Sequence, residues 1–432
     1  MRTTFSTLTT RGRAFVVAGA TAIVSAVVVG LDDLTRIGAL LLLLPVLTAV
    51  ALTRGQHRLT LTRTVTPHRL TAGQTATVEL DLRNEGRVPT GLLLLEEQVP
   101  YALGVRARFV VDRMGSRWHR TVSYAVRSDV RGRFTLGPMA VRVHDPFGLV
   151  ELDRTFTSTA DLVVTPKVVP LPAIPLEGVW TGSGDNRPRD FVGGSAEDVT
   201  VREYRRGDDL RRVHWRSSAH AGELMVRREE QPWQSRATLF VDNRRHAHRG
   251  AGLGSSFEYA VIVAASVGLH LAQRGFRVRL VTAEGHDTDH KWHDHAAGTE
   301  SGPLLESLAL LGTVARTTID TSWLSDAHQT GLQVAVLGET LPVDRAALSR
   351  MRHAASTPLA IALDTEQWQR SMGVVPAEPA ALGLLTATGW RAVAAGPQAP
   401  LAGVWQQLGL LSRRGRSGAS AAAPTIGASG VR

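Results

Sequence analysis

Two long apolar stretches near the N-terminus constrain the fold of this 432-residue chain more than any other feature. Residues 14–31 and 37–53 contain no charged side chain, and only a short turn separates them. Each is at the short end of what crosses a hydrocarbon core of about 30 Å at about 1.5 Å per helical residue. Because the turn is so short, residues 1–58 are predicted to form an antiparallel hairpin of two transmembrane helices.

The flanking charges predict how this hairpin is oriented. Three arginines precede the first stretch and three follow the second, whereas the turn has two acids and one arginine. The six flanking residues are Arg2, Arg11, Arg13, Arg54, Arg58 and Arg63. Since basic residues favour the cytoplasmic side, we expect a two-span protein of the cell membrane with the bulk of the chain in the cytoplasm. A cleaved signal peptide is the alternative, but its apolar core would be shorter and no second span would follow.

The amino-acid composition excludes several classes of protein and of functional site. The chain has no Cys, which excludes a disulfide framework, thiolate zinc sites and a cysteine nucleophile. Basic residues outnumber acidic ones by 49 to 39, and the resulting charge of +10 could favour binding to nucleic acid, to an anionic membrane or to acidic partners. Six arginines flank the hairpin, and eight more lie beside four acids in one window. Because these arginines have other expected roles, the net charge by itself does not indicate nucleic-acid binding, and no nucleic-acid partner is expected.

Residues 59–165 are predicted to form a small antiparallel β-sandwich. Thr75–Leu82 alternates apolar and polar residues as a half-buried strand does, and further short strands follow between turns that contain Gly and Pro. Asp145–Leu149, with the sequence Asp-Pro-Phe-Gly-Leu, is interpreted as one of these tight corners. Four prolines within residues 166–175 indicate an extended linker, which we place at 166–200.

Residues 201–411 are predicted to contain a signature motif and an α/β domain with a mostly parallel sheet, because short apolar strands alternate with helical patterns. The strands are expected at 237–241, 276–282, 333–337 and 358–363, and the helices at 257–274, 304–311 and 343–355. Ligands of such folds bind beyond the carboxyl ends of the strands. Residues 412–432 contain no acid and are predicted to form a disordered tail.

The densest group of charged residues lies between Arg202 and Arg228, with eight arginines and four acids. A short strand is predicted at 201–204, and Trp215 is expected to be buried near Leu210 and Val213. Three interpretations of this window remain open. Its arginines and aspartates could pair and fix the loop, form a docking surface for another protein, or act in catalysis and phosphate capture.

Residues 202–216 read Arg-Glu-Tyr-Arg-Arg-Gly-Asp-Asp-Leu-Arg-Arg-Val-His-Trp-Arg, and Gly-Glu-Leu-Met-Val-Arg follows at 222–227. This motif resembles the signature of the domain-of-unknown-function-fifty-eight family, as do the hairpin and the Asp145–Leu149 segment. The residues assigned to the interaction signature are Arg202, Glu203, Tyr204, Gly207, Asp208, Asp209, Arg211, Arg212, His214, Trp215, Arg216 and Glu223. The resemblance implies a bacterial membrane-anchored protein whose C-terminal half is similar to a von Willebrand factor A domain.

Members of this family are commonly encoded beside MoxR-type AAA ATPases and transglutaminase-like membrane proteins, which the resemblance implies as partners. The leading hypothesis is a membrane-anchored scaffold or accessory protein that docks a MoxR-type ATPase and is not an enzyme. One alternative is a hydrolase that uses Asp208, Asp209 or His214, although the chain has no nucleophile elbow, phosphate loop or zinc motif. Another is nucleic-acid binding through the Arg-rich signature.

The resemblance also implies a position for a metal. In von Willebrand A domains an Asp after the first strand and two Ser at alternate positions supply oxygen ligands for Mg²⁺. Asp242 is the matching residue here, but Arg244 and His246 replace the two Ser, so no metal and no cofactor are expected. A second candidate, His286–His295 with four His and three Asp, is interpreted as a solvated polar loop.

Overall fold

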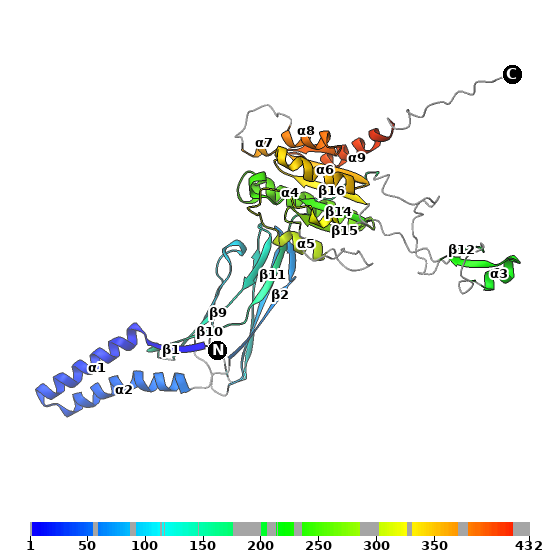
Figure 1. The fold of residues 1–432 in the computed structure, drawn as a ribbon. Helices are drawn as coiled ribbons and strands as arrows, with labels where there is room; N and C mark the ends of the chain where they lie inside the picture. Colours follow the sequence, from blue (N-terminus) through cyan, green and yellow to red (C-terminus); the bar gives the residue numbers. More distant parts are fainter. Residues whose placement is uncertain are drawn as a thin grey trace, which may run out of the picture. The chain divides into compact units, whose positions relative to one another are not determined.

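The computed structural model describes residues 2–54, 59–86, 92–112, 115, 117–145, 147–175, 200–204, 213, 215–228, 236–285, 302–325, 331–369 and 379–417. The chain divides into two compact units (Figure 1). The first unit contains Met1–Val168 together with Ala251–Gly254 and Gly302–Gly312. The second contains Val169–Gly250, Ser255–Ser301 and Thr313–Arg432. The break after Val168 lies close to the start of the predicted linker.

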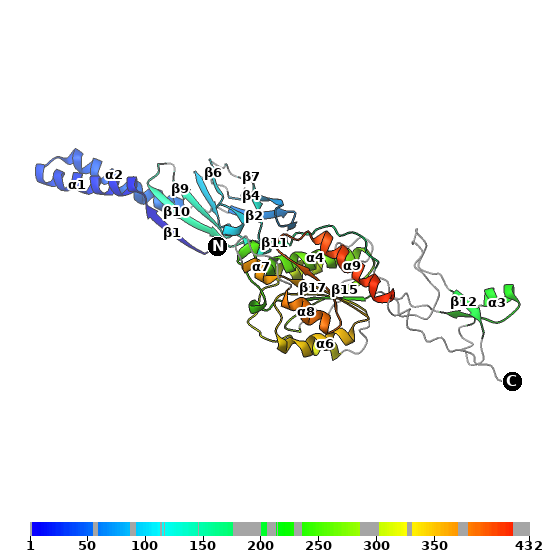
Figure 2. The same cartoon turned by 90° about the horizontal axis from the view of Figure 1, so that it is seen from above.

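The predicted helical hairpin is present as α1 (Thr10–Val29) and α2 (Asp32–Arg54), which lie side by side in both views (Figures 1 and 2). Both helices are long and apolar enough to cross a membrane. Their apolar side chains are mostly exposed, with Val28 at 79% and Leu40 at 64%, whereas a core helix of a soluble protein would bury them. Where the helices touch, a Cβ added to Gly19 or Gly38 would lie 2.9 Å from the carbonyl oxygen of the other glycine. Close contact through small residues is typical of helix pairs in membranes.

The first unit continues as an antiparallel β module, as predicted. Its strands after the hairpin are β2 (Leu59–Thr66), β3 (Arg69–Thr71), β4 (Thr75–Asn84), β5 (Leu93–Glu97), β6 (Arg108–Val111), β7 (His119–Arg127), β8 (Gly132–Leu136), β9 (Met139–His144), β10 (Val150–Phe156) and β11 (Ala160–Thr165). In β4 the residues Ala76, Val78, Leu80 and Leu82 face one common core while the residues between them point outward. With β1 (Arg2–Leu8), the sheets have the orders β1-β10-β9-β5-β6, β2-β4-β7 and β3-β11-β8, and among them β3 and β11 pair in parallel.

Two elements of the first unit were not predicted to belong there. Strand β1 (Arg2–Leu8) pairs antiparallel with β10, so the residues before α1 are part of the β module as well as of the hairpin segment. Helix α5 (Gly302–Leu310) follows β15 (Arg277–Thr282) in the chain but packs on β11 and β8. Arg131 donates from Nε to the carbonyl oxygen of Leu308 at 3.0 Å. Local periodicity can predict that such segments form a strand or a helix. It cannot predict which sheet the strand pairs with or which sheet the helix packs on.

Arg63 corrects one of the arguments for orientation. We counted it among the arginines that flank the hairpin, but its side chain is 1% exposed inside the β module and pairs with Glu97. It cannot contact a membrane surface, so it carries no weight in the charge asymmetry that sets the orientation.

The second unit contains the predicted parallel α/β sheet (Figure 2). Its strands are β14 (Arg236–Val241), β15 (Arg277–Thr282), β16 (Leu332–Leu337), β17 (Thr357–Leu363) and β18 (Arg391–Ala395). Its larger helices are α4 (Ser256–Gln273), α6 (Arg345–Ala354), α7 (Thr365–Gln369), α8 (Ala380–Ala387) and α9 (Leu401–Ser417). Every residue of β16 and β17 is buried, as expected of parallel strands covered on both faces. The order β15-β14-β16-β17-β18 reverses between β14 and β16, which makes this the topological switch point.

Helix α9 overturns the start of the predicted disordered tail. The tail was expected from residue 412, but the helix continues through Ser417. Trp405 and Leu408 are fully buried, so the packing of one face stabilises the helix. The charged residues at the end of the segment do not predict that the helix continues there. Residues 418–432 lie outside the described part of the chain.

Candidate functional site

The carboxyl edge of the parallel sheet carries a polar residue after each of three neighbouring strands. Asp242 follows β14, Glu339 lies two residues beyond β16, and Asp364 follows β17. The loop after β14 crosses to β16, where the amide of Glu339 donates to the carbonyl oxygen of Ala247 at 2.8 Å. A Cβ at Gly338 would lie 2.0 Å from that same oxygen, so this approach requires glycine. The chain's own loop therefore fills the crevice at the switch point.

Arg244 is the centre of that loop and is completely buried. Its Nε and Nη2 donate to the two carboxylate oxygens of Asp242, each at 2.9 Å. Its Nη1 and Nη2 donate to the carboxylate of Asp344 at 2.7 and 3.1 Å, and Nη1 also donates to the carbonyl oxygen of Thr317 at 3.1 Å. All five N–H donors of the guanidinium are thus used in one arrangement. Asp344 comes from the turn before α6, so the cluster joins segments 100 residues apart.

This cluster is a charged site that the protein itself has filled. Burial opposes the charged form of Arg244, but the hydrogen bonds and charges of Asp242 and Asp344 outweigh it and raise the pKa of the guanidinium. A divalent cation would have to occupy the same space against that fixed positive charge. The residues therefore do not fit the Mg²⁺ that the family resemblance implies at Asp242. His246, the other replacement, lies on the turn Arg245–Ala247.

His248 holds the same loop in place. Its Nε2 donates to the carbonyl oxygen of Asp242 at 2.6 Å, and its Nδ1 accepts from the hydroxyl of Ser256 at 3.1 Å. Because a carbonyl oxygen only accepts, this arrangement requires a proton on Nε2. Burial is the main reason that the pKa of His248 lies below its ordinary value. The ring is therefore a structural support for the loop.

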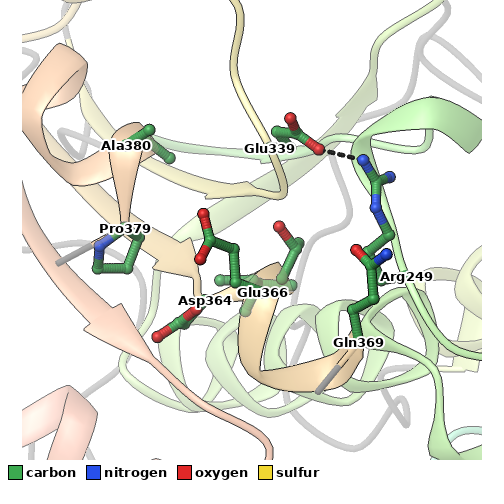
Figure 3. A pocket seen from close by; sticks show the side chains of 10 residues that line it. Arg249, Glu339, Asp364, Glu366, Gln369, Pro379 and Ala380 are labelled. Atoms are coloured by element: carbon green, nitrogen blue, oxygen red, sulfur yellow. Dashed lines mark hydrogen bonds and ion pairs between the residues drawn. The ribbon is translucent and has the colours of Figure 1, made fainter. Parts of the chain in front are cut away.

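A pocket of about 530 Å³ opens beside the filled crevice, at the ends of β16 and β17. It is lined by Arg249, Glu339, Leu363, Asp364, Thr365, Glu366, Gln369, Pro379, Ala380 and Ala381. Figure 3 shows the ion pair of Arg249 with Glu339 on one side of the pocket and Pro379 with Ala380 on the other. Asp364 is held by Gln367, whose Nε2 donates to it at 2.7 Å. None of these residues was predicted from the sequence, although Asp364 directly follows a predicted strand and could have been found by that position.

The family signature forms a small element of its own in the second unit. Strand β12 (Thr200–Glu203) pairs antiparallel with β13 (Met225–Arg228), and α3 (Trp215–Ala221) lies between them in the chain. Val213 forms a β-bridge with Val226, and both side chains are buried. The amide of Met225 donates to the hydroxyl of Ser218 at 2.8 Å. The predicted strand at 201–204 is confirmed within one residue.

Trp215 contradicts its prediction, because its side chain is 70% exposed. The prediction placed Leu210 and Val213 on the inner face of a helical turn, with Trp215 buried near them. In the structure Val213 is extended and α3 begins only at Trp215, so that helical spacing does not apply. Glu203, Arg216 and Glu223 are also exposed, and Tyr204 is half-buried.

The other signature residues cannot be placed. Gly207, Asp208, Asp209, Arg211, Arg212 and His214 lie outside the described residues, as does the His286–His295 segment, and of Arg202 only the backbone is described. Within the described ranges, no group of three or more His, Asp or Glu is arranged to hold a metal ion.

An apolar helical pair, an antiparallel β module and a parallel α/β sheet define the class of architecture. Residues 200–292 match the family described as "Protein of unknown function DUF58", the family that the signature in this segment resembles. No curated protein sequence matches the chain.

Similarity to solved structures is low. The CARDB domain of a Pyrococcus furiosus protein, in complex with di-metal ions, has 13% identity over 26% of this chain and 96% of its own, with a TM-score of 0.19. The Pseudomonas fluorescens alkylpurine DNA glycosylase AlkC has 17% identity over 31% of this chain and 38% of its own, with a TM-score of 0.18. A Listeria innocua β-glucosidase has 14% identity over 26% of this chain and 16% of its own, with a TM-score of 0.16. Similarities of this size carry no functional argument.

Proposed function

We propose that this protein is a membrane-anchored interaction protein. The hairpin α1–α2 holds it in the bilayer with both units on the cytoplasmic side, and the signature element docks a protein partner. The family resemblance supports a MoxR-type AAA ATPase as that partner, with a transglutaminase-like membrane protein as a second component. The α/β domain is a von Willebrand A-like scaffold without the metal site of that class.

The observation that carries this proposal is the exposure of Trp215. The side chain lies 70% open to solvent in the family signature, beside the exposed Arg216, and Leu224 of the same element is 41% exposed. Trp and Arg are the residue types most enriched among the side chains that dominate protein–protein binding energy. Among the side chains of this element that the structure describes, Val213 and Val226 are the buried ones, and the indole of Trp215 is left open to solvent. A partner surface would bury it.

The filled crevice at Arg244 supports the same conclusion. Its guanidinium occupies the space between Asp242 and Asp344, where a metal-dependent member of this fold class would place its cation. A domain built in this way presents a rigid surface and supplies no Lewis acid at this point. Among the described residues, no contact favours the hydrolase or the nucleic-acid alternative.

The test is the binding of the full-length protein, in detergent micelles or nanodiscs, to a purified MoxR-type ATPase from the same organism. We expect Trp215→Ala to weaken binding at least about tenfold, since a buried hot-spot Trp contributes about 2 kcal/mol or more. Tyr101→Ala is the matched control, because Tyr101 is an aromatic residue 99% exposed in the first unit. Equal affinity of Trp215→Ala and the unmodified protein would contradict the docking surface. Absence of binding by the unmodified protein, with and without nucleotide, would contradict the partner class.

A further inference from the structure

The Asp145–Leu149 turn, which joins β9 to β10, has a shape fixed by one buried carboxylate. Oδ1 of Asp145 accepts from the amides of Leu149 at 2.6 Å and Val150 at 2.8 Å, and Oδ2 accepts from the amide of Phe147 at 3.1 Å. Such side-chain-to-backbone bonds hold a turn that has few other contacts. The carbonyl oxygens of Gly148 and Leu149 accept hydrogen bonds from another segment.

That other segment is the start of α1. The hydroxyl of Thr9 donates to the carbonyl oxygen of Gly148 at 2.6 Å, and the amide of Thr9 donates to that of Leu149 at 3.0 Å. Thr9 is also the N-cap of α1, since its Oγ1 accepts from the amide of Gly12 at 3.2 Å. A Cβ at Gly12 would lie 2.2 Å from the Leu149 oxygen, so the turn and the helix are in direct backbone contact. The turn therefore clamps α1 to the β module.

This clamp sets the depth of the turn relative to the apolar stretch. The stretch begins at Ala14, five residues after Thr9, which is about 7 Å along a helix at about 1.5 Å per residue. The polar layer on each side of a bilayer is about 5–7 Å thick, given a core of about 30 Å and a total of about 40–45 Å. Thr9 and the turn bound to it thus lie at the level of the headgroups. Phe147, in that turn, is 59% exposed.

Two further loops lie at the same end of the β module. Leu8 at the end of β1 faces Val150 at the start of β10, and the next pairings place the end of β9 and the start of β5 beside them. The carbonyl oxygen of Leu92 accepts there from the amide of His144 at 3.1 Å. Leu92 is 38% exposed.

Trp118 completes this end of the module. Its carbonyl oxygen accepts from the amide of Asn84, the last residue of β4. Asn84 pairs with Leu59 at the start of β2, and β2 begins shortly after the end of α2. The Trp118 side chain is 37% exposed, and its neighbour Arg117 is exposed and adopts a φ of 56°, a left-handed conformation that is rare outside glycine. Arg11 and Arg13, in the first turn of α1, are exposed as well.

We propose that these residues form a membrane collar, defined as Leu92, Trp118 and Phe147 with Arg11, Arg13 and Arg117. The apolar and aromatic side chains insert into the headgroup layer, and the arginines bind the phosphates of anionic phospholipids. Aromatic residues with flanking arginines are the side chains that favour this layer. The collar rests on the proposed membrane anchoring and adds to it a second lipid contact, which fixes the tilt of the β module on the bilayer.

The absence of Cys from the chain makes a direct test possible. Single-cysteine variants Phe147→Cys and Trp118→Cys of the full-length protein carry an environment-sensitive fluorophore in vesicles that contain anionic phospholipid. We expect both labels to be quenched strongly by lipids with a nitroxide at the headgroup. Tyr101→Cys is the control, because it follows the opposite end of β5 and is 99% exposed, and its label should stay unquenched.

Val28→Cys separates this proposal from the anchoring on which it rests. Val28 is 79% exposed on α1, so its label should be quenched by nitroxides within the acyl chains. If it is not, the anchoring fails. If Val28 is quenched but Phe147 and Trp118 behave like Tyr101, the collar is wrong while the anchoring stands. Equal quenching at Trp118 in zwitterionic and in anionic vesicles would overturn the role of the arginines.

Discussion

Each unit of this protein buries an arginine, and the two are stabilised in different ways. Arg244 in the α/β domain has two carboxylate partners and uses all five of its N–H donors. Arg63 in the β module has one, Glu97, with Nη2 and Oε1 2.7 Å apart but poorly aligned for a hydrogen bond. Its Nη1 donates to the carbonyl oxygen of Ser158 at 2.6 Å.

The protonation equilibria reflect this difference. The two carboxylates around Arg244 raise its pKa in spite of burial. In the β module, burial raises the pKa of Glu97, and the charge of Arg63 offsets this only in part. Burial, reinforced by Glu97, also raises the pKa of the neighbouring Tyr124. Hydrogen-bonded partners on all sides thus favour the charged form of a buried group, whereas a single imperfect pair offsets the effect of burial only in part.

The largest effect is expected from Arg244→Met. It leaves Asp242 and Asp344 buried side by side without a cation, and breaking a buried pair in this way costs about 3–5 kcal/mol. Denaturant unfolding followed by a probe in the second unit should show this loss. Arg245→Met is the matched control, because Arg245 is exposed, and it should change stability by less than about 0.5 kcal/mol.

Arg244→Ser sharpens the idea that the guanidinium takes the place of a cation. The variant leaves two carboxylates and a hydroxyl around the vacated space, which are the ligand types that Mg²⁺ prefers. We expect millimolar Mg²⁺ to raise the melting temperature of this variant and not that of the unmodified protein. The same response in both, or in neither, would contradict the idea.

Arg63→Met should have a smaller effect, at the lower end of the same range, about 3 kcal/mol at neutral pH. Glu97 can escape its unpaired charge by taking up a proton, because burial already raises its pKa above 4.5. A raised acid pKa means that the folded state binds more protons than the unfolded one, so stability falls as the pH rises above 4.5 through the folded value. The loss in Arg63→Met should therefore shrink on acidification, which urea unfolding at pH 5 and pH 8 would measure. Arg83→Met, in an exposed pair with Asp81, is the control.

The two arginines also show how far the sequence alone could go. Asp242 and Arg244 were recognised because they follow a predicted strand at a position where the family resemblance implies a metal. Their partner Asp344 was not, since it lies 100 residues further along and only the folded sheet brings it near. Arg63 was misinterpreted as a membrane flank because its distance from the second apolar stretch fits that role equally well.

Periodicity was reliable where burial is one-sided or complete. The alternation in β4 and the apolar runs of β14 to β17 predicted strands close to their observed bounds. It could not predict that β1 joins β10, because that pairing brings together segments that lie far apart in the sequence, such as Leu8 and Val150. It also misplaced Trp215, where a few residues decide between an extended and a helical segment.

The smallest expected effect is a change of the unfolding free energy with pH. Its sign distinguishes the loop around Arg244 from the pair of Arg63 with Glu97. Burial, reinforced by the charges of Arg244 and Arg249, outweighs the attraction of Asp242 and keeps the pKa of His248 below 6.5. The unfolded state then binds more protons below pH 6.5, so the stability of the second unit falls as the pH decreases through this window. The slope is at most about 1.4 kcal/mol per pH unit for each proton.

His248→Gln should flatten this slope, measured as the unfolding free energy between pH 7.5 and 5.5. A residual slope is expected from His270, whose pKa burial also lowers. His353→Gln, at an exposed position on α6, should leave the slope unchanged. The dependence of stability on pH is opposite to that expected for Glu97. Acidification lowers the stability of the site with the neutral His248, but it raises the stability of the β module, where the pKa of Glu97 is raised. If acidification instead stabilised the second unit, the preference of the buried His248 ring for its neutral form would be wrong.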